Sequence, residues 1–471
     1  MTHTSMPSTF RSGAFASASL ALALLAISAA AHAQSEFPAA KMPSGITSVP
    51  HAVTYTKDVA PIIQQNCQQC HQPGSIAPIN LMTYEDAKKY SNRIKTKVSQ
   101  RLMPPWHIDR TVGIQQFKND RSLSDEQVAT IVDWVNQGSP QGDAKDMPPA
   151  MNFPDPNRWQ LAEKLGQQPD LIVKSKPYTL GARTQDKWFK PVVETGLKEP
   201  RWVRAIEVKP ARDQDRKIVH HALMYLIQDE GSTVTGLAES AHDHQTNAGL
   251  FMEWAVGKTG QIFPDDDGKL MLPDSKIRWE VHYHAIGTEY TDSQVEMAVY
   301  FYPKGYVPKH RTVLRMFDVS RSTELDIPPN EKTITQNFYV LPAPARLENF
   351  QPHMHMRGKA MSLEAIYPDG RKEIISQVSS FQWNWHVNYI YAADVAPLLP
   401  KGTTLAFTAW HDNTAANPLN PDPNQWIGWG DRTVDEMAHN WIDVTYLNQD
   451  EFDTMVADRK AKTAAAKKVV P

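Results

Sequence analysis

Two cysteines and a neighbouring histidine form the first group of residues whose spacing could do chemistry. The chain holds 2 cysteines, Cys67 and Cys70, and His71 follows them directly in the string CQQCH. Two thiols at this spacing before a histidine are typical of covalent haem attachment, in which the thiols bond to vinyl groups and the imidazole binds iron. A redox disulfide and half of a zinc site are the alternatives, and neither needs the histidine. The pattern predicts one covalent haem c.

The opposite side of that haem needs a second ligand, which we expect in the string RLMPPWH at residues 101–107. Met103 stands before two prolines, which stop helical structure and leave its thioether on an extended loop. A thioether ligand also raises the reduction potential of a haem. His107 is the alternative ligand.

Pairs of histidines dominate the second half of the chain. They are His220 and His221 in VHHALMY, His282 and His284 in WEVHYHAIG, and His353 and His355 in PHMHMRG. Alternate residues of a strand share one face, so each of the last two pairs could hold one metal ion. The adjacent histidines of the first pair could do so only if the backbone bulges or twists there. Imidazoles alone suit zinc, whereas a methionine thioether selects copper.

The elements that must position these residues change in character along the chain. Residues 50–145 have helical spacing, and LSDEQVATIVDWVNQG predicts an amphipathic helix opened by Ser124 and Gln127 and closed by Gly138. Residues 146–168 are rich in proline and predict a linker or docking strap. From residue 169, short alternating runs between turn residues predict antiparallel sheets. We expect a multidomain protein with a small all-α domain, two β-sandwiches at 169–326 and 327–450, and a C-terminal tail at 451–471.

The first residues predict export. Arg11 precedes the apolar run AFASASLALALLAISAA, and AHA at residues 31–33 matches a signal peptidase site. Residues 1–33 are therefore expected to be a signal peptide, with an N-terminal membrane anchor as the alternative. The mature protein is expected in the periplasm without a membrane span.

Composition and missing motifs narrow the function further. A formal net charge of −3 with 21% charged residues gives no indication of a nucleic-acid partner. The sequence has no G-x-S-x-G elbow, phosphate-binding loop or dinucleotide glycine fingerprint. The chemistry is therefore expected from bound metals, with the protein supplying geometry, a dry pocket and electron access.

Two resemblances to known families sharpen these expectations. The region around CQQCH resembles small bacterial c-type cytochrome domains. The strings HHALMY, VHY, PHMHMRGK and DRTVDEMAHNWIDVTYL, in this order, resemble the copper motifs of the ascorbate-dependent type II copper monooxygenases. That family includes peptidylglycine alpha-hydroxylating monooxygenase and dopamine beta-monooxygenase. The resemblance spans about residues 165 to 450. It implies two jelly-roll sandwiches that face each other across a solvent-filled cleft.

The same resemblance implies two copper ions and their ligands. One copper would be held by His220, His221 and His282, and the other by His353, His355 and Met437. In the family, the all-histidine copper stores and delivers an electron. The copper with the methionine ligand binds dioxygen and attacks a C–H bond, so His353, His355 and Met437 are the expected catalytic residues.

Several positions depart from the family. Gln351 stands where the peptide-hydroxylating enzyme has an arginine that holds the substrate carboxylate, and His439 and Trp441 replace an asparagine and a tyrosine. A peptide ending in glycine is therefore not the expected substrate. Tryptophans are instead expected to line a pocket for an apolar or aromatic molecule; they are Trp383, Trp385, Trp426, Trp429 and Trp441.

Three further histidines have no required role in the resemblance. His284 could support a ligand, lie at the surface or serve as an alternative ligand. His242 and His244, in the loop-like string ESAHDHQTNAG, are expected to be exposed, with an adventitious metal site as the alternative.

Together these patterns predict a copper-dependent monooxygenase that hydroxylates a small substrate with dioxygen. Its two coppers need re-reduction, and its own haem would deliver the electrons from a cytochrome, a quinol-linked chain or ascorbate. The alternatives are a copper and haem protein that transfers electrons or handles copper without oxygenase activity, and a surface interaction module with inert jelly rolls.

Overall fold

The computed structural model describes residues 37–38, 48–75, 77–153, 155, 157–229, 248–255, 258, 260–319 and 324–469. The predicted signal peptide at 1–33 and the pair His242 and His244 lie outside the described residues. Those from residue 48 onward belong to one compact unit, Ala40–Pro471. Its helical segments are η1 (Tyr55–Val59), α2 (Ala60–Asn66), α3 (Tyr84–Lys89), α4 (Ser91–Ser99), α5 (Asp125–Asn136), η2 (Ala144–Asp146), α6 (Gln160–Leu165), η3 (Asp215–Lys217) and α7 (Gln449–Val469).

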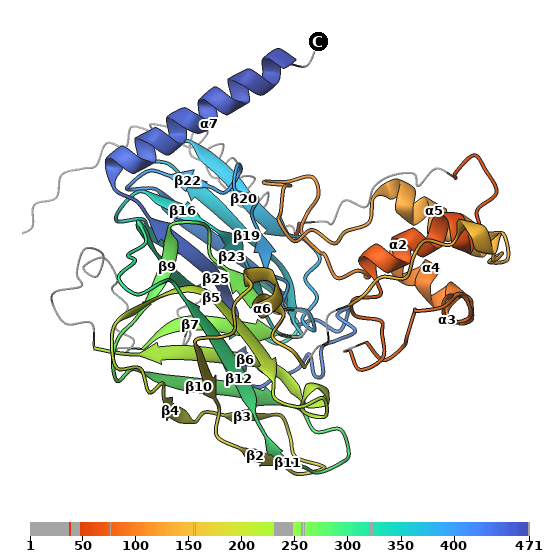
Figure 1. Ribbon diagram of the computed structural model, residues 1–471, viewed down its shortest axis with the longest axis horizontal. Helices are drawn as coiled ribbons and strands as arrows, with labels where there is room; N and C mark the ends of the chain where they lie inside the picture. The colour runs from red at the N-terminus through yellow and green to blue at the C-terminus, as the bar shows by residue number, and fades with distance from the viewer. Residues whose placement is uncertain are drawn as a thin grey trace, which may run out of the picture. The chain divides into compact units, whose positions relative to one another are not determined.

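The first helices share one hydrophobic core, which contains buried residues of η1, α2, α4 and α5 (Figure 1). Helix α5 is the predicted capped helix. Ser124 Oγ accepts a hydrogen bond from the Gln127 backbone at 3.1 Å, and Gln127 Oε1 accepts one from the Ser124 backbone at 2.9 Å. Gly138 follows the helix end with a φ of 87°, a conformation that glycine adopts without strain. Long loops precede α3 and α5, whereas η1 continues directly into α2 and only Tyr90 separates α3 from α4.

Residues 105–119 leave the helices and join the β region. Ile108 and Phe117 form isolated β-bridges with Val378 and Tyr391. The buried Trp106 belongs to the same hydrophobic core as these strands. The helical residues are therefore tied to the β region by backbone pairing as well as by apolar packing.

From residue 171 the structure is almost entirely antiparallel β-sheet, as the alternating pattern predicted. Its strands are β1 (Leu171–Lys174), β2 (Tyr178–Leu180), β3 (Lys187–Phe189), β4 (Val192–Glu194), β5 (Arg201–Pro210), β6 (Val219–Ile227), β7 (Ala248–Ala255), β8 (Gly260–Ile262), β9 (Asp267–Met271), β10 (Lys276–Tyr283), β11 (Tyr290–Ser293), β12 (Val295–Phe301), β13 (His310–Asp318), β14 (Asp326–Ile327), β15 (Lys332–Val340), β16 (Ala345–Leu347), β17 (Asn349–Phe350), β18 (Pro352–Met354), β19 (Gly358–Ile366), β20 (Lys372–Val378), β21 (Tyr389–Ile390), β22 (Leu398–Leu399), β23 (Thr404–Asp412), β24 (Ile427–Gly428) and β25 (Ala438–Tyr446).

The β region contains two large hydrophobic cores, which supports two β units. One core gathers residues between Val173 and Phe301, and the other gathers residues from Phe317 onward together with the docked residues 106 and 108. A ten-stranded sheet nevertheless runs through both units in the order β1-β12-β5-β9-β13-β25-β16-β22, with β8 also paired to β5 and β18 to β25. Strand β13 pairs with β25 from Thr312 to Asp318. Strand β13 thus already pairs with a strand of the second unit, although it precedes the boundary that the sequence predicted between residues 326 and 327.

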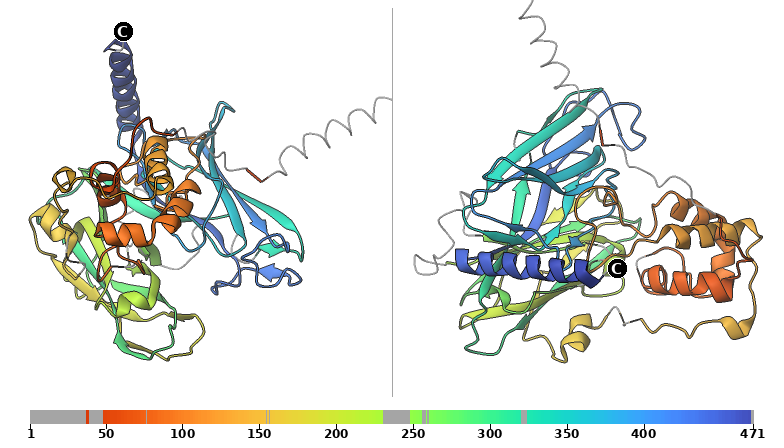
Figure 2. Two further views of the ribbon diagram at one scale, coloured as in Figure 1. Left: turned by 90° about the vertical axis from the view of Figure 1, so that its right-hand side faces the viewer. Right: turned by 90° about the horizontal axis from the view of Figure 1, so that it is seen from above.

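Two segments outside the sheets are more ordered than their composition indicated. Helix α6 lies inside the proline-rich segment 146–168, and the backbone amides of Gln160 and Leu161 each donate to a carboxylate oxygen of Glu207 at 2.8 Å. The tail predicted at 451–471 belongs largely to α7, which Figure 2 shows as one continuous helix. Among the residues that the structure describes, no helix combines the length and apolar composition that a membrane crossing requires.

Candidate metal centre

The first histidine site lies where β6 and β10 pair. His221 stands directly opposite His282 in the antiparallel register. The register shifts just beyond this pair, because Tyr283 pairs with Val219, and His220 is therefore the bulged residue. The bulge that the sequence required for these adjacent histidines is present. Nδ1 of His220 lies 3.1 Å from Nδ1 of His221, and one ligand atom from each of the three histidines lies within 4.8 Å of the others.

The nitrogen geometry of this site fits a metal ion. Metal–nitrogen bonds of about 2 Å at near-tetrahedral angles place two ligand nitrogens about 3.3 Å apart. The Nδ1 atoms of His220 and His221 are close to that separation. In addition, Nε2 of His221 and both ring nitrogens of His282 are buried without a hydrogen-bond partner. A buried polar atom without a partner costs about 1–3 kcal/mol, and a bound ion would remove that cost for each nitrogen that ligates it.

Two residues beside this site, Trp188 and Asp186, could not be predicted from the spacing of the histidines. Trp188 on β3 stacks on His282 with ring centroids 4.7 Å apart at 4°, and it meets His221 edge-on at 4.8 Å. Asp186 places Oδ2 3.5 Å from His282 Nε2 and Oδ1 2.8 Å from His284 Nδ1. The His284 side chain is 64% exposed. His284 thus contacts the carboxylate beside the site, and β10 ends at Tyr283 before the expected same-face pair is complete.

The second histidine site lies at the start of β25. Strand β18 pairs His353 with His439 and Met354 with Ala438. The next residues beyond this register are His355 on one chain segment and Met437 on the other. Met437 is buried with 6% exposure. The pairing therefore brings His353, His355 and Met437 to one end of β25, from positions more than eighty residues apart in the sequence.

Hydrogen bonds from residues 435 and 436 fix the orientation of the second site. His355 Nδ1 lies 3.1 Å from the Asp435 carbonyl oxygen, which selects Nδ1 as the donor and leaves Nε2 with a lone pair. The buried Glu436 carboxylate accepts from the backbone amides of His355 at 2.9 Å and Met437 at 3.3 Å. Burial raises the pKa of Glu436 to about 7. This carboxylate therefore holds the backbones of two predicted ligands, His355 and Met437, close to each other.

The two sites adjoin each other. The rings of His221 and His353 have centroids 6.1 Å apart, and both residues are nearly fully buried. His386, which no spacing pattern marked, lies between them at 4.8 Å from His221 and 4.6 Å from His353. The solvent-filled cleft that the resemblance implied is not present between these residues, because imidazoles occupy the space. His439 extends the group and stacks on His353 at 4.9 Å.

Burial keeps the imidazoles neutral, which is the form that binds metal. It lowers the pKa of His220 and His355 to about 4. The pKa values of His221, His353 and His386 are lowered well below the ordinary value by burial and, to a smaller degree, by the surrounding imidazoles. A group of neutral, buried, incompletely hydrogen-bonded imidazoles beside a thioether suits a soft cation such as copper.

In the peptide-hydroxylating enzyme, the residue at the position of Gln351 holds the substrate carboxylate. In this chain, Gln351 contacts a carboxylate of the protein itself. It is buried, and its side-chain Nε2 donates to Glu253 Oε2 at 2.7 Å. Of the five tryptophans predicted to line a pocket, Trp441 is buried with its ring 4.8 Å from that of His353. Trp426 and Trp429 are exposed, because they lie on the loop before β25.

The residues of the predicted haem site also fit their expected group. Cys67 and Cys70 are free thiols at the end of α2, and Cys67 packs against the helical core. His71 Nδ1 lies 3.0 Å from the Ile79 carbonyl oxygen, so Nδ1 donates and Nε2 keeps the lone pair that iron would take. Burial lowers the pKa of His71, which favours the neutral ligand. These residues would hold one covalent haem.

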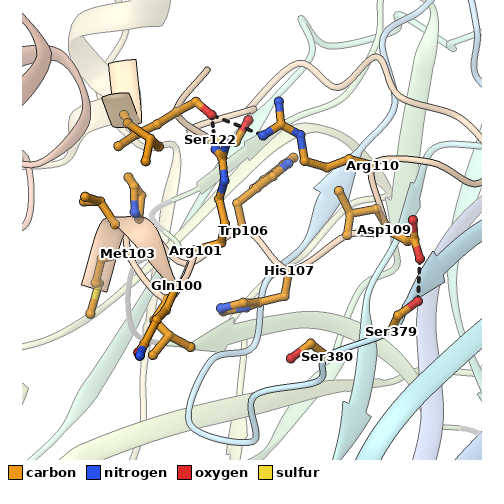
Figure 3. A pocket seen from close by; sticks show the side chains of 16 residues that line it. Gln100, Arg101, Met103, Trp106, His107, Asp109, Arg110, Ser122, Ser379 and Ser380 are labelled. Carbon is orange, nitrogen blue, oxygen red and sulfur yellow. Dashed lines mark hydrogen bonds between the residues drawn. The ribbon is translucent and has the colours of Figure 1, made fainter. Parts of the chain in front are cut away.

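Both candidates for the second iron ligand face one pocket. Met103 and His107 line a pocket of about 770 Å³, counting the space open to solvent (Figure 3). Residues 98, 123 and 128 of the helical core and residues 379 and 380 of the β region complete its wall. His107 Nε2 is buried without a partner, and burial lowers the pKa of His107 to about 4. Cys67, Cys70 and His71 do not line this pocket.

Comparison with known proteins does not assign a family. No family model matches the chain, and no curated protein matches it. Solved structures with partial likeness include the major capsid protein P2 of bacteriophage PM2, with 11% identity, 59% of this chain and 96% of that chain covered, and a TM-score of 0.28. The cowpea mosaic virus top component shares 8% identity over 64% and 94%, also at 0.28. PNGF-II shares 8% over 70% and 71%, at 0.24. Such low values identify neither a family nor a function.

Proposed function

We propose that this chain is a periplasmic copper-dependent monooxygenase with a built-in haem c domain. It hydroxylates a C–H bond of a small apolar or aromatic substrate with dioxygen. The observation that supports the proposal is the convergence of His220, His221 and His282 beside His353, whose strand β18 pairs with β25 up to Ala438, the neighbour of Met437 in the chain. The two β units would be the jelly rolls of the copper monooxygenases that the sequence motifs resemble.

The protein's own residues prepare both metal positions. Copper, when bound, would supply the one-electron chemistry that dioxygen and a C–H bond require. His220, His221 and His282 would hold one ion, and His353, His355 and Met437 the other. The carbonyl of Asp435 and the carboxylate of Glu436 orient the second set. Trp188 and Trp441 pack against the imidazoles and exclude water from them.

The haem would supply single electrons to the copper centre, taken from a cytochrome, a quinol-linked chain or ascorbate. Cys67 and Cys70 would anchor it and His71 would bind its iron, with Met103 or His107 on the other side. Residues 108–119 follow these candidate ligands and pair with Val378 at the end of β20 and with Tyr391 just after β21, so the loop that carries Met103 and His107 is held against the β region.

The substrate class follows from the side chains near the second site. Gln351 has a neutral amide and so offers no cation to a carboxylate, and that amide donates to Glu253. Trp441 and the apolar surroundings of β25 favour a molecule without charge. A peptide ending in glycine is therefore not the proposed substrate.

Dioxygen uptake by the reduced, copper-loaded protein tests the proposal. We expect about two coppers per haem, and uptake that Met437→Ala abolishes. Met252→Ala is the matched control, because Met252 is buried in the first β core away from this site; its folded fraction should retain uptake. Uptake that Met437→Ala leaves unchanged would contradict the role of Met437.

A second candidate is a copper and haem protein that transfers electrons or handles copper without oxygenase activity. The contact between the rings of His221 and His353 favours it, because nearly buried imidazoles leave little room for a substrate between the two sites. Two bound coppers together with no dioxygen uptake, and with reduced haem that dioxygen does not reoxidise, would identify this function.

A further inference from the structure

His386 lies between the two predicted copper sites and belongs to neither predicted ligand set. Its ring centroid is 4.6 Å from that of His353, 4.8 Å from His221 and 5.8 Å from His220. The residue is 8% exposed. It lies in the loop between β20 and β21, and only the folded chain brings it to the other histidines.

A buried carboxylate faces one nitrogen of this ring. His386 Nδ1 lies 3.8 Å from Glu253 Oε1, beyond hydrogen-bond distance, and both atoms are buried without a hydrogen-bond partner. The other oxygen of Glu253 accepts from Gln351 Nε2 at 2.7 Å and lies 3.3 Å from Lys258 Nζ. Gln351 and Lys258 therefore hold the carboxylate so that Oε1 faces His386.

This arrangement determines which nitrogen can bind a metal. When Glu253 is ionised, a proton on Nδ1 faces its carboxylate and Nε2 keeps the lone pair. Metal-binding histidines in proteins commonly donate their second ring N–H to a carboxylate in this way, which fixes the tautomer and the ring orientation. A histidine buried only for packing would not need three other imidazoles around it.

We propose that His386 is a copper ligand additional to the six predicted ones, and that Glu253 positions it. The inference rests on the proposed function, because it requires that copper occupies the histidine sites. It also gives Gln351 a role in this chain. In place of holding a substrate, its amide holds the carboxylate that orients His386.

Copper binding to the purified full chain tests the inference without any activity measurement. Each of the two copper affinities is measured by competition with a chelator, and the imidazole nitrogens of the Cu(II) form are counted by pulsed electron paramagnetic resonance. We expect His386→Ala to remove one imidazole and to lower one affinity at least about tenfold. Glu253→Gln keeps the side-chain shape and should lower the same affinity by about 10–100-fold.

The matched control is His310→Ala. His310 has the same exposed fraction, 8%, but contacts Asp267 away from the histidine cluster, so folded protein of this variant should keep both affinities. Wild-type affinities and spectra in both folded His386→Ala and Glu253→Gln would overturn the inference alone. A wild-type protein that binds fewer than about two coppers would overturn the inference together with the proposed function.

Discussion

Acidification should unfold the metal-free β region well before it unfolds the helices. In the folded protein, burial lowers the pKa of His220, His355, His411 and His439 to about 4, and it lowers the pKa of His221, His353 and His386 well below the ordinary value. The unfolded chain takes up these protons near pH 6.5. Below that pH the unfolded state binds more protons, so stability falls as pH falls.

The size of this effect follows from the pKa shifts. At pH 5, 1.5 units below the unfolded value, each imidazole that is still neutral in the fold costs about 2 kcal/mol, at about 1.36 kcal/mol per unit. The four imidazoles whose pKa is about 4 together approach about 8 kcal/mol. Glu436 acts in the opposite direction, because a carboxyl whose pKa is raised to about 7 adds stability as pH falls. It returns about 3 kcal/mol, which leaves a net loss of about 5 kcal/mol, comparable to the whole stability of many domains.

Amide hydrogen exchange of the metal-free protein measures this loss locally, after correction for the intrinsic pH dependence of exchange. Between pH 7 and pH 5, protection in β6, β10 and β18 should collapse, whereas protection in α5 should persist. Helix α5 is the internal control, because it belongs to the separate helical core. Equal protection of β6 at both pH values would refute the reasoning, since the imidazoles would then have to be hydrated or already protonated in the folded state.

Three further predictions concern residues around the candidate sites. Replacing both Cys67 and Cys70 with alanine should remove the mass of one haem from protein matured in the periplasm, as measured by intact mass spectrometry; an unchanged mass would contradict covalent attachment. Asp186→Asn should lower the copper affinity of the adjacent site by about 10–100-fold, measured by chelator competition, and an unaltered affinity would show that the carboxylate does not orient its ligands. In the wild-type protein, the buried Lys269 lies 2.9 Å from the Asp443 carboxylate. Asp443→Asn removes this counter-charge and should lower the free energy of unfolding by about 3–5 kcal/mol, which would be measured as a lower thermal midpoint. A midpoint within error of wild type would mean that Lys269 finds another partner.

Local signals in the sequence were sufficient for some features and not for others. The Ser124–Gln127 cap and Gly138 predicted both ends of α5, because capping depends on residues within one turn. The adjacent pair His220 and His221 predicted a bulge, because two neighbouring side chains of a regular strand cannot share a face. The alternating runs predicted antiparallel β-sheet from residue 169 onward.

The features that the sequence missed depend on pairing over long distances. Trp188 reaches the first site through the register of β3 with β10, almost one hundred residues away. His386 has no spacing relation to the other histidines, and its place depends on how the loop after β20 packs. The join of β13 to β25 spans more than one hundred residues, and side-chain periodicity does not encode which strands become neighbours.

The docking of residues 105–119 on β20 and β21 limits how this protein can be divided. Trp106 packs edge-on against Tyr389 with ring centroids 4.8 Å apart, and Phe117 stacks on Tyr391 at 5.7 Å. A fragment cut in the proline-rich segment after residue 146 would lose these partners and expose an aromatic surface that the intact chain covers. The helical and β portions are thus not interchangeable modules joined by a tether, and any exchange of one portion between homologues must carry the matching docking surface with it.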